Sequence, residues 1–119
     1  DYAWNHVRNS SKGTPLIWTT FGDETYKKQA DKNITLILYG VHGDEITPIK
    51  FCFDILAELK SKPELTKEKL VIIAPIVTPD SFFTKRPSRT NAKGVDVNRN
   101  FPTKDWAMLA LKLWREQYK

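Results

Sequence analysis

The chain has 119 residues, of which 40% are hydrophobic and 28% charged, and its formal net charge is +5 at pH 7. This length and composition predict one folded domain with a modest core, and they exclude an intrinsically disordered chain. No apolar run is long enough to span a bilayer, and the lysines are scattered along the sequence, so we predict no membrane span and no nucleic-acid-binding surface.

The first residue and the cysteine content bear on the cellular compartment. The chain begins with Asp1 rather than methionine and contains no signal peptide, so we expect a processed or trimmed product. Cys52 is the only cysteine and therefore forms no internal disulfide, so cysteine usage indicates neither an oxidising nor a reducing compartment.

The first third of the chain predicts one strand between polar segments. Residues 1–14 are polar and include a turn signal, which predicts an extended lead-in or a short helix, and His6 is expected at the surface. Residues 15–21 are rich in strand-favouring residues and stop at a Gly-Asp turn. Residues 23–33 are mostly charged or polar and are expected to form a connector.

An apolar run at residues 34–39 predicts a central strand covered on both faces. A strand ending near Tyr39 places His42 in the loop at its carboxyl end and Glu45 in the next turn, so both side chains can converge on one point. An imidazole nitrogen and a carboxylate oxygen are two of the usual ligands of a catalytic zinc. The alternative is a polar turn, in which Glu45 is solvated and His42 bonds only to backbone.

A strand–helix–strand unit is predicted around this turn. Thr47 is expected to cap the helix and Pro48 to occupy its first position. Residues at helical spacing form an apolar stripe for packing on the sheet: Ile49, Cys52, Phe53, Leu56 and Leu59. Cys52 is therefore interpreted as a core residue rather than a nucleophile, and residues 70–74 are the next buried strand.

The last forty residues combine a long irregular segment with a helix. Residues 78–102 show no sustained periodicity, which in a compact domain is typical of a functional loop. Residues 105–119 predict an amphipathic helix whose apolar face we interpret as core packing: Trp106, Leu109, Ala110, Leu113 and Trp114.

The segment from Arg89 to Pro102, RTNAKGVDVNRNFP, is the second informative motif. One interpretation is a basic loop whose Asn and Asp side chains bond to local backbone. The other is anion capture, in which a guanidinium binds a carboxylate and a neighbouring Asn amide adds a donor. Metal ligands on one loop and a carboxylate clamp on another together indicate a hydrolase acting on peptide ends.

The two motifs in this order, residues 40–45 (GVHGDE) and 91–102 (NAKGVDVNRNFP), resemble the zinc carboxypeptidase family, nearest to its bacterial murein-peptide amidase and carboxypeptidase branch. The resemblance implies an α/β fold, with a mixed, mostly parallel sheet and helices packed on its faces. It implies that residues 1–119 form a single, apparently truncated domain that corresponds to the amino-terminal half of that fold.

For the metal, the resemblance implies that His42 and Glu45 bind one Zn²⁺. Asp44 is expected to orient these two ligands from outside the coordination sphere. The family brings its third zinc ligand and its general base from the carboxyl-terminal half, so we expect both to lie outside this chain. The chain by itself is therefore expected to be inactive.

For the substrate, the resemblance implies that Asn98 and Arg99 bind a terminal carboxylate. It also implies an arginine that polarises the scissile carbonyl, for which Arg89 is preferred and Arg86 is the alternative.

The predicted function is that of a zinc-dependent carboxypeptidase hydrolysing an amide bond near a free carboxylate, with murein peptides as the favoured substrate. This implies a periplasmic, cell-envelope or secreted protein. We also expect the final helix to pack against structure outside this chain, which leaves an apolar patch and a sheet edge exposed by the truncation and available for self-association. Two alternatives remain: a deacylase of N-acyl amino acids with the same fold, and a non-catalytic carboxylate-binding domain.

Overall fold

The computed structural model describes residues 1–29 and 32–117. Its strands are β1 (Asn5–Asn9), β2 (Pro15–Gly22), β3 (Ile34–Leu38) and β4 (Leu70–Ala74). Its helices are α1 (Ile46–Ser61), α2 (Pro79–Phe82) and α3 (Trp106–Gln117), with short 3₁₀ turns η1 (Glu24–Lys28), η2 (Pro63–Thr66) and η3 (Val97–Arg99). No helix in the described ranges has both the length and the apolar character needed to cross a membrane.

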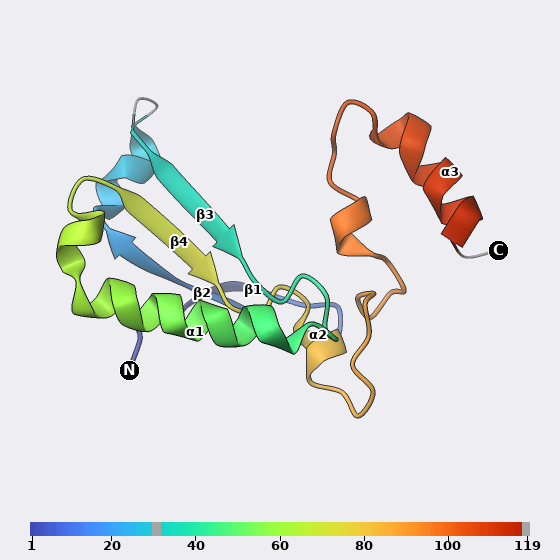
Figure 1. The fold of residues 1–119 in the computed structure, drawn as a ribbon, viewed down its shortest axis with the longest axis horizontal. Helices are drawn as coiled ribbons and strands as arrows, with labels where there is room; N and C mark the ends of the chain where they lie inside the picture. Colours follow the sequence, from blue (N-terminus) through green and yellow to red (C-terminus); the bar gives the residue numbers. More distant parts are fainter. Residues whose placement is uncertain (30–31, 118–119) are drawn as a thin grey trace.

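The described strands form one mixed sheet in the order β1-β2-β4-β3. β1 pairs antiparallel with β2, β2 pairs antiparallel with β4, and β3 pairs parallel with β4. α1 connects the two parallel strands and lies along one face of the sheet (Figure 1). The predicted mixed α/β architecture is confirmed, and among the described strands its parallel part is the β3–β4 pair.

β1 was not predicted, because residues 1–14 were expected to form a lead-in or a short helix. All five residues of the strand are exposed, so its sequence carries no alternation between apolar and polar positions. The strand forms because it pairs with β2 from Asn5 opposite Trp18 to Asn9 opposite Pro15. Such pairing is a tertiary contact that local sequence does not encode.

The core lies between α1 and β4. Leu56 of α1 and Leu70 and Ile73 of β4 are fully buried. Cys52 is also fully buried in this cluster, as predicted, and burial raises the pKa of its thiol to about 11. A thiol this basic is protonated near neutral pH, which agrees with a packing role.

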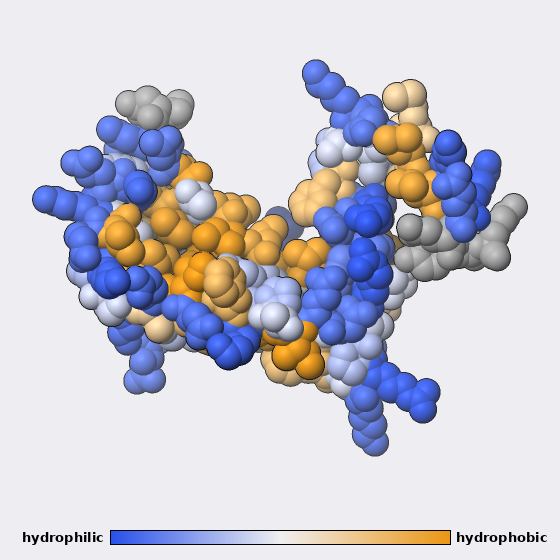
Figure 2. All heavy atoms as spheres, viewed as in Figure 1, coloured by the Kyte–Doolittle hydropathy of each residue, from blue (hydrophilic) through white to orange (hydrophobic). Residues whose placement is uncertain are grey.

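β3 lies at one edge of the described sheet, so its prediction as a central strand covered on both faces is wrong for this structure. Ile34, Leu36 and Leu38 are 43%, 60% and 37% exposed. In the view of Figure 2, apolar surface lies over β3 and α1. An apolar run indicates that a strand favours burial, but it does not say how many neighbours pair with it. The expected self-association through such surface stays a prediction.

The start of the connecting helix and the burial of its stripe differ in detail from the prediction. α1 begins at Ile46, one residue before the predicted cap Thr47, and Pro48 lies in its first turn. A proline is tolerated there because the first N–H groups of a helix have no intrahelical partner. Of the predicted apolar stripe, Ile49, Cys52 and Leu56 are buried, whereas Phe53 is 44% exposed.

α3 projects away from the sheet (Figure 1). Its apolar residues were predicted to pack in the core, but Trp106, Leu109 and Trp114 are 42%, 45% and 56% exposed. The prediction of a helix was correct over the described residues, and residues 118 and 119 lie outside them. The exposure of its apolar residues departs from the interpretation as core packing, because periodicity identifies an apolar face without identifying what covers it. It agrees with the expectation that this helix leaves an apolar patch uncovered.

Candidate metal and substrate site

His42 lies in the loop that leaves the carboxyl end of β3, as the sequence predicted, and is 3% exposed. Gly40 opens this loop with a φ of 57°, a left-handed conformation that favours glycine, and a Cβ there would lie 3.0 Å from the Cα of Ile76. The carbonyl of Gly40 accepts hydrogen bonds from the backbone N–H of Val77 and of Thr78. The loop is therefore fixed against the segment that follows β4.

The imidazole of His42 lies between two carboxylates. Its Nδ1 is 2.8 Å from Oε1 of Glu45, and its Nε2 is 3.2 Å from Oδ1 of Asp96. A neutral imidazole carries one N–H, so it can donate to only one of these carboxylates. The other contact needs a second proton or a metal cation between the two atoms.

Asp96 is 8% exposed and accepts several hydrogen bonds. Arg89 Nε donates to its Oδ2 at 2.8 Å, and the backbone N–H of Asn98 donates to its Oδ1 at 3.0 Å. Burial disfavours the ionised carboxyl, but the hydrogen bonds and charges of His42 and Arg89 outweigh it and hold the pKa of Asp96 below its usual range. Asp96 is therefore a carboxylate suited to accept the Nε2 proton of His42.

The guanidinium of Arg89 contacts both carboxylates. Besides its bond to Asp96, its Nη1 lies 3.7 Å from Oε1 of Glu45, and its side chain is 39% exposed. The structure thus brings together His42 and Glu45, the two predicted metal ligands, and Arg89, the preferred arginine. The exposed part of Arg89 faces solvent, where a substrate could reach it.

The donor set of the pair fits zinc. With Nε2 protonated toward Asp96, His42 directs the Nδ1 lone pair at the side of Glu45. Tetrahedral zinc has bonds of about 2.0–2.2 Å, so two of its ligand atoms lie roughly 3.3 Å apart, a few tenths of an ångström more than the separation seen here. Across residues 1–29 and 32–117, no three His, Cys, Asp or Glu side chains are grouped to hold a metal ion by themselves. His42 and Glu45 would therefore supply only part of the coordination shell of such an ion.

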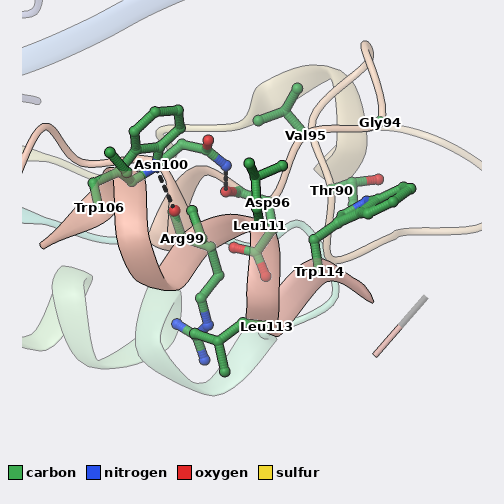
Figure 3. A pocket seen from close by; sticks show the side chains of 12 residues that line it. Thr90, Gly94, Val95, Asp96, Arg99, Asn100, Trp106, Leu111, Leu113 and Trp114 are labelled. Atoms are coloured by element: carbon green, nitrogen blue, oxygen red, sulfur yellow. Dashed lines mark hydrogen bonds between the residues drawn. The ribbon is translucent and has the colours of Figure 1, made fainter. Parts of the chain in front are cut away.

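The residues predicted to bind a carboxylate adjoin Asp96 in the turn η3. Nη1 of Arg99 bonds to the carbonyl of Asn98 at 3.3 Å, and Nε1 of Trp106 donates to the carbonyl of Arg99 at 3.0 Å. Arg99 forms no ion pair with the residues that the structure describes. Its side chain points toward Leu113 in a cavity of about 570 Å³ between residues 90–100 and α3 (Figure 3).

Two predicted site residues are not brought into this cluster. Asp44 is exposed and has no hydrogen bond to His42, and Arg86 is exposed and has no ion pair with the described residues. Besides Glu45, the carboxylate that contacts His42 is that of Asp96, for which the motifs predicted no role. Adjacency to His42 in sequence favoured Asp44, whereas the fold brings in a residue 54 positions away.

Comparison with known proteins identifies the family of this chain. The sequence profile described as zinc carboxypeptidase matches residues 4–115. The chain belongs to the zinc carboxypeptidase family. Murein peptide amidase A of Escherichia coli K12 is 36% identical over 101 residues, which cover 85% of this chain and 36% of that protein. The Vibrio campbellii murein peptide amidase A is 34% identical over 95 residues, 79% of this chain and 33% of that protein.

Solved structures also match the fold of this chain. Bovine thrombin-activatable fibrinolysis inhibitor, in complex with tick carboxypeptidase inhibitor, superimposes with a TM-score of 0.70 at 25% identity, covering 89% of this chain and 38% of that one. The chain thus spans about a third of the length of the curated relatives it matches. The resemblance stated from the two motifs is confirmed, and the observed sheet is part of that fold.

Proposed function

We propose that this chain supplies two zinc ligands and the carboxylate-binding residues of a zinc-dependent peptidase. The observation that carries the proposal is the position of His42 between Glu45 and Asp96. Asp96 accepts the Nε2 proton and thereby leaves Nδ1 and Glu45 Oε1 as two metal-binding atoms aimed at one point. Hydrogen bonding of the non-coordinating nitrogen to a carboxylate is typical of zinc-binding histidines.

Each residue then has a definable task. A zinc ion held by His42 and Glu45 would supply Lewis-acid chemistry, which polarises a carbonyl and acidifies a bound water. His42 and Glu45 hold the metal, and Asp96 fixes the tautomer of His42. Arg89, whose guanidinium is partly exposed beside Glu45, is placed to donate to a carbonyl oxygen as negative charge develops there. The third ligand and the general base that the resemblance implies are not grouped at this site in the described residues.

The proposed substrate is a peptide with a free terminal carboxylate. Arg99 supports this choice because its guanidinium has no carboxylate partner in the described residues and lines an open cavity. The relatives named murein peptide amidase A favour murein peptides, and with them a place in the periplasm or the cell envelope. No observation favours the deacylase or the non-catalytic alternative over this assignment.

The substrate assignment is tested with Arg99→Ala. Binding of a peptide acid and of its terminal amide is measured by calorimetry with zinc present. A hydrogen bond to a charged group contributes about 1.5–3 kcal/mol, so the variant should bind the acid roughly ten- to a hundredfold more weakly and the amide unchanged. Arg115→Ala, on the exposed part of α3, is the control. Equal loss for acid and amide would count against the carboxylate clamp.

A further inference from the structure

α2 and the residue before it contact both loops of the site. Thr78 is 5% exposed, and its hydroxyl donates to the carbonyls of Gly40 and Val41 at 3.0 and 3.1 Å, in the loop that carries His42. Ser81 is 3% exposed, and its hydroxyl donates to the carbonyl of Thr90, the residue after Arg89. The segment from Thr78 to Ser81 is therefore hydrogen-bonded at its start to the loop that carries His42 and at its end to the loop that carries Arg89.

Ser81 also limits how closely the two loops approach. A Cβ built on Gly43 would lie 2.5 Å from the carbonyl carbon of Ser81 and 2.6 Å from its Cβ. At that distance no side chain fits, so the residue after His42 must be glycine while Ser81 keeps its place. Ser81 thus contacts the residue after His42 with its backbone and Cβ, and bonds to the residue after Arg89 with its hydroxyl.

A second hydrogen bond closes the same arrangement. The backbone N–H of Gly43 donates to the carbonyl of Ser88 at 2.9 Å, which joins the loop of His42 to the loop of Arg89 directly. Hydrogen bonds and one close contact therefore connect four residues of these segments into one unit: Gly43, Ser81, Ser88 and Thr90. The 3.2 Å contact between His42 Nε2 and Asp96 Oδ1 spans the same two loops.

We propose that Ser81 is a positioning residue for the metal site: through Thr90 and Gly43 it holds Asp96 and Arg89 at hydrogen-bonding distance from His42. This inference rests on the proposed function for its zinc readout, but the geometry it concerns exists without the metal. Asp80, next to Ser81, strengthens the anchor. Its carboxylate accepts from Ser10 Oγ at 2.7 Å and Thr14 Oγ1 at 2.8 Å, which fixes α2 to the turn between β1 and β2.

Ser81→Ala is the test, because it removes the buried hydroxyl that donates to the carbonyl of Thr90 and keeps the exposed Ser88 hydroxyl, which donates to the same carbonyl. The first readout needs no metal: the Nε2 proton of His42, followed in an imidazole ¹H–¹⁵N spectrum. In the wild-type chain its hydrogen bond to Asp96 should protect this proton from exchange with water. In Ser81→Ala we expect exchange at least tenfold faster.

The second readout is the zinc affinity of the 119-residue chain, measured by competition with a chromophoric chelator. Loss of an interaction that orients a zinc ligand typically weakens metal affinity ten- to a hundredfold, and we expect about tenfold for Ser81→Ala. Ser88→Ala is the matched control, because its hydroxyl donates to the same carbonyl of Thr90 but is exposed and is replaceable by water. We expect a change of less than about twofold there.

A double-mutant cycle separates positioning from general stabilisation. If Ser81 acts through Asp96, then Ser81→Ala in an Asp96→Asn background should weaken zinc binding no further. Additive losses, or an unchanged proton exchange rate and zinc affinity alongside a lower melting temperature, would show that Ser81 is merely structural and would overturn the inference. If no zinc binds to the wild-type chain but the His42 proton still responds to Ser81→Ala, the positioning role holds and the proposed metal function fails.

Discussion

The core and the site are stabilised by different interactions. Around Cys52, Leu56 and Ile73, buried side chains are apolar and pack without hydrogen bonds. Around His42 and Asp96, the buried side chains are polar, and each is hydrogen-bonded to a residue on another loop. Fold stability and site geometry can therefore be perturbed separately, because the residues named in the two regions are different.

The largest effect is expected from the core. Leu56→Ala removes a fully buried side chain from α1 and should lower the free energy of unfolding by about 2–5 kcal/mol. Chemical denaturation followed by circular dichroism measures this loss. Phe53→Ala on the same helix, where the side chain is 44% exposed, is the control and should cost clearly less. Similar losses at both positions would mean that the described core is misplaced.

A smaller and more selective effect is expected from Asp96→Asn. The substitution keeps the shape of the side chain and removes the charge that orients His42, so zinc affinity should fall about ten- to a hundredfold. Denaturation in the absence of zinc should show a smaller change than Leu56→Ala. Asp44→Asn makes the comparison sharper, because Asp44 has no hydrogen bond to His42 in the described residues and its substitution should leave zinc affinity within about twofold. A larger loss at Asp44 than at Asp96 would restore the role expected from sequence.

The smallest effect concerns pH. The pKa of Asp80 is held below its usual value of 3.8, chiefly by the hydrogen bond from Ser10 and with help from Thr14, Lys12 and Ser11, while burial acts in the opposite direction. A carboxyl with a lowered pKa stabilises the fold above its unfolded-state pKa, and this contribution is lost as pH falls through the lower folded-state value. The wild type should therefore melt above Asp80→Asn near neutral pH, with the difference shrinking below about pH 4.

Asp54→Asn is the control for this pH effect, because Asp54 is exposed on α1 and its carboxylate pairs with Lys50. Melting temperatures between pH 2 and pH 7, measured for the wild type and both variants, check the prediction. A gap between the wild type and Asp80→Asn that stays constant down to the lowest pH would contradict it.

The sequence predicted what local pattern encodes. The apolar runs of β3 and β4, the stripe of α1 and the turn that carries His42 and Glu45 were each identified from residue order alone. β1 was missed because its exposed residues form a strand only by pairing with β2. The edge position of β3 departs from its prediction as a covered strand because apolar residues do not specify their neighbours. The exposed face of α3 agrees with the expectation that this helix leaves an apolar patch uncovered.

In the site, too, residues in local motifs were predicted and a contact that depends on the fold was not. His42, Glu45 and Arg89 were predicted from motifs, and the fold places them together. Asp96 was missed because its local hydrogen bond to Asn98 fits an ordinary turn, and its contact with His42 depends on a distant loop. The Asp at the start of the Asp-Val-Asn-Arg segment was a usable signal, since a zinc-binding histidine commonly bonds to a carboxylate.

The central claim is that Asp96 accepts a hydrogen bond from the Nε2–H of His42, which leaves Nδ1 to bind a metal beside Glu45. A long-range ¹H–¹⁵N spectrum of the zinc-saturated chain tests it most directly, because coordinated and protonated imidazole nitrogens have different shifts. The account predicts zinc on Nδ1 and a proton on Nε2 of His42. Coordination through Nε2, or a spectrum of His42 that zinc leaves unchanged, would contradict it.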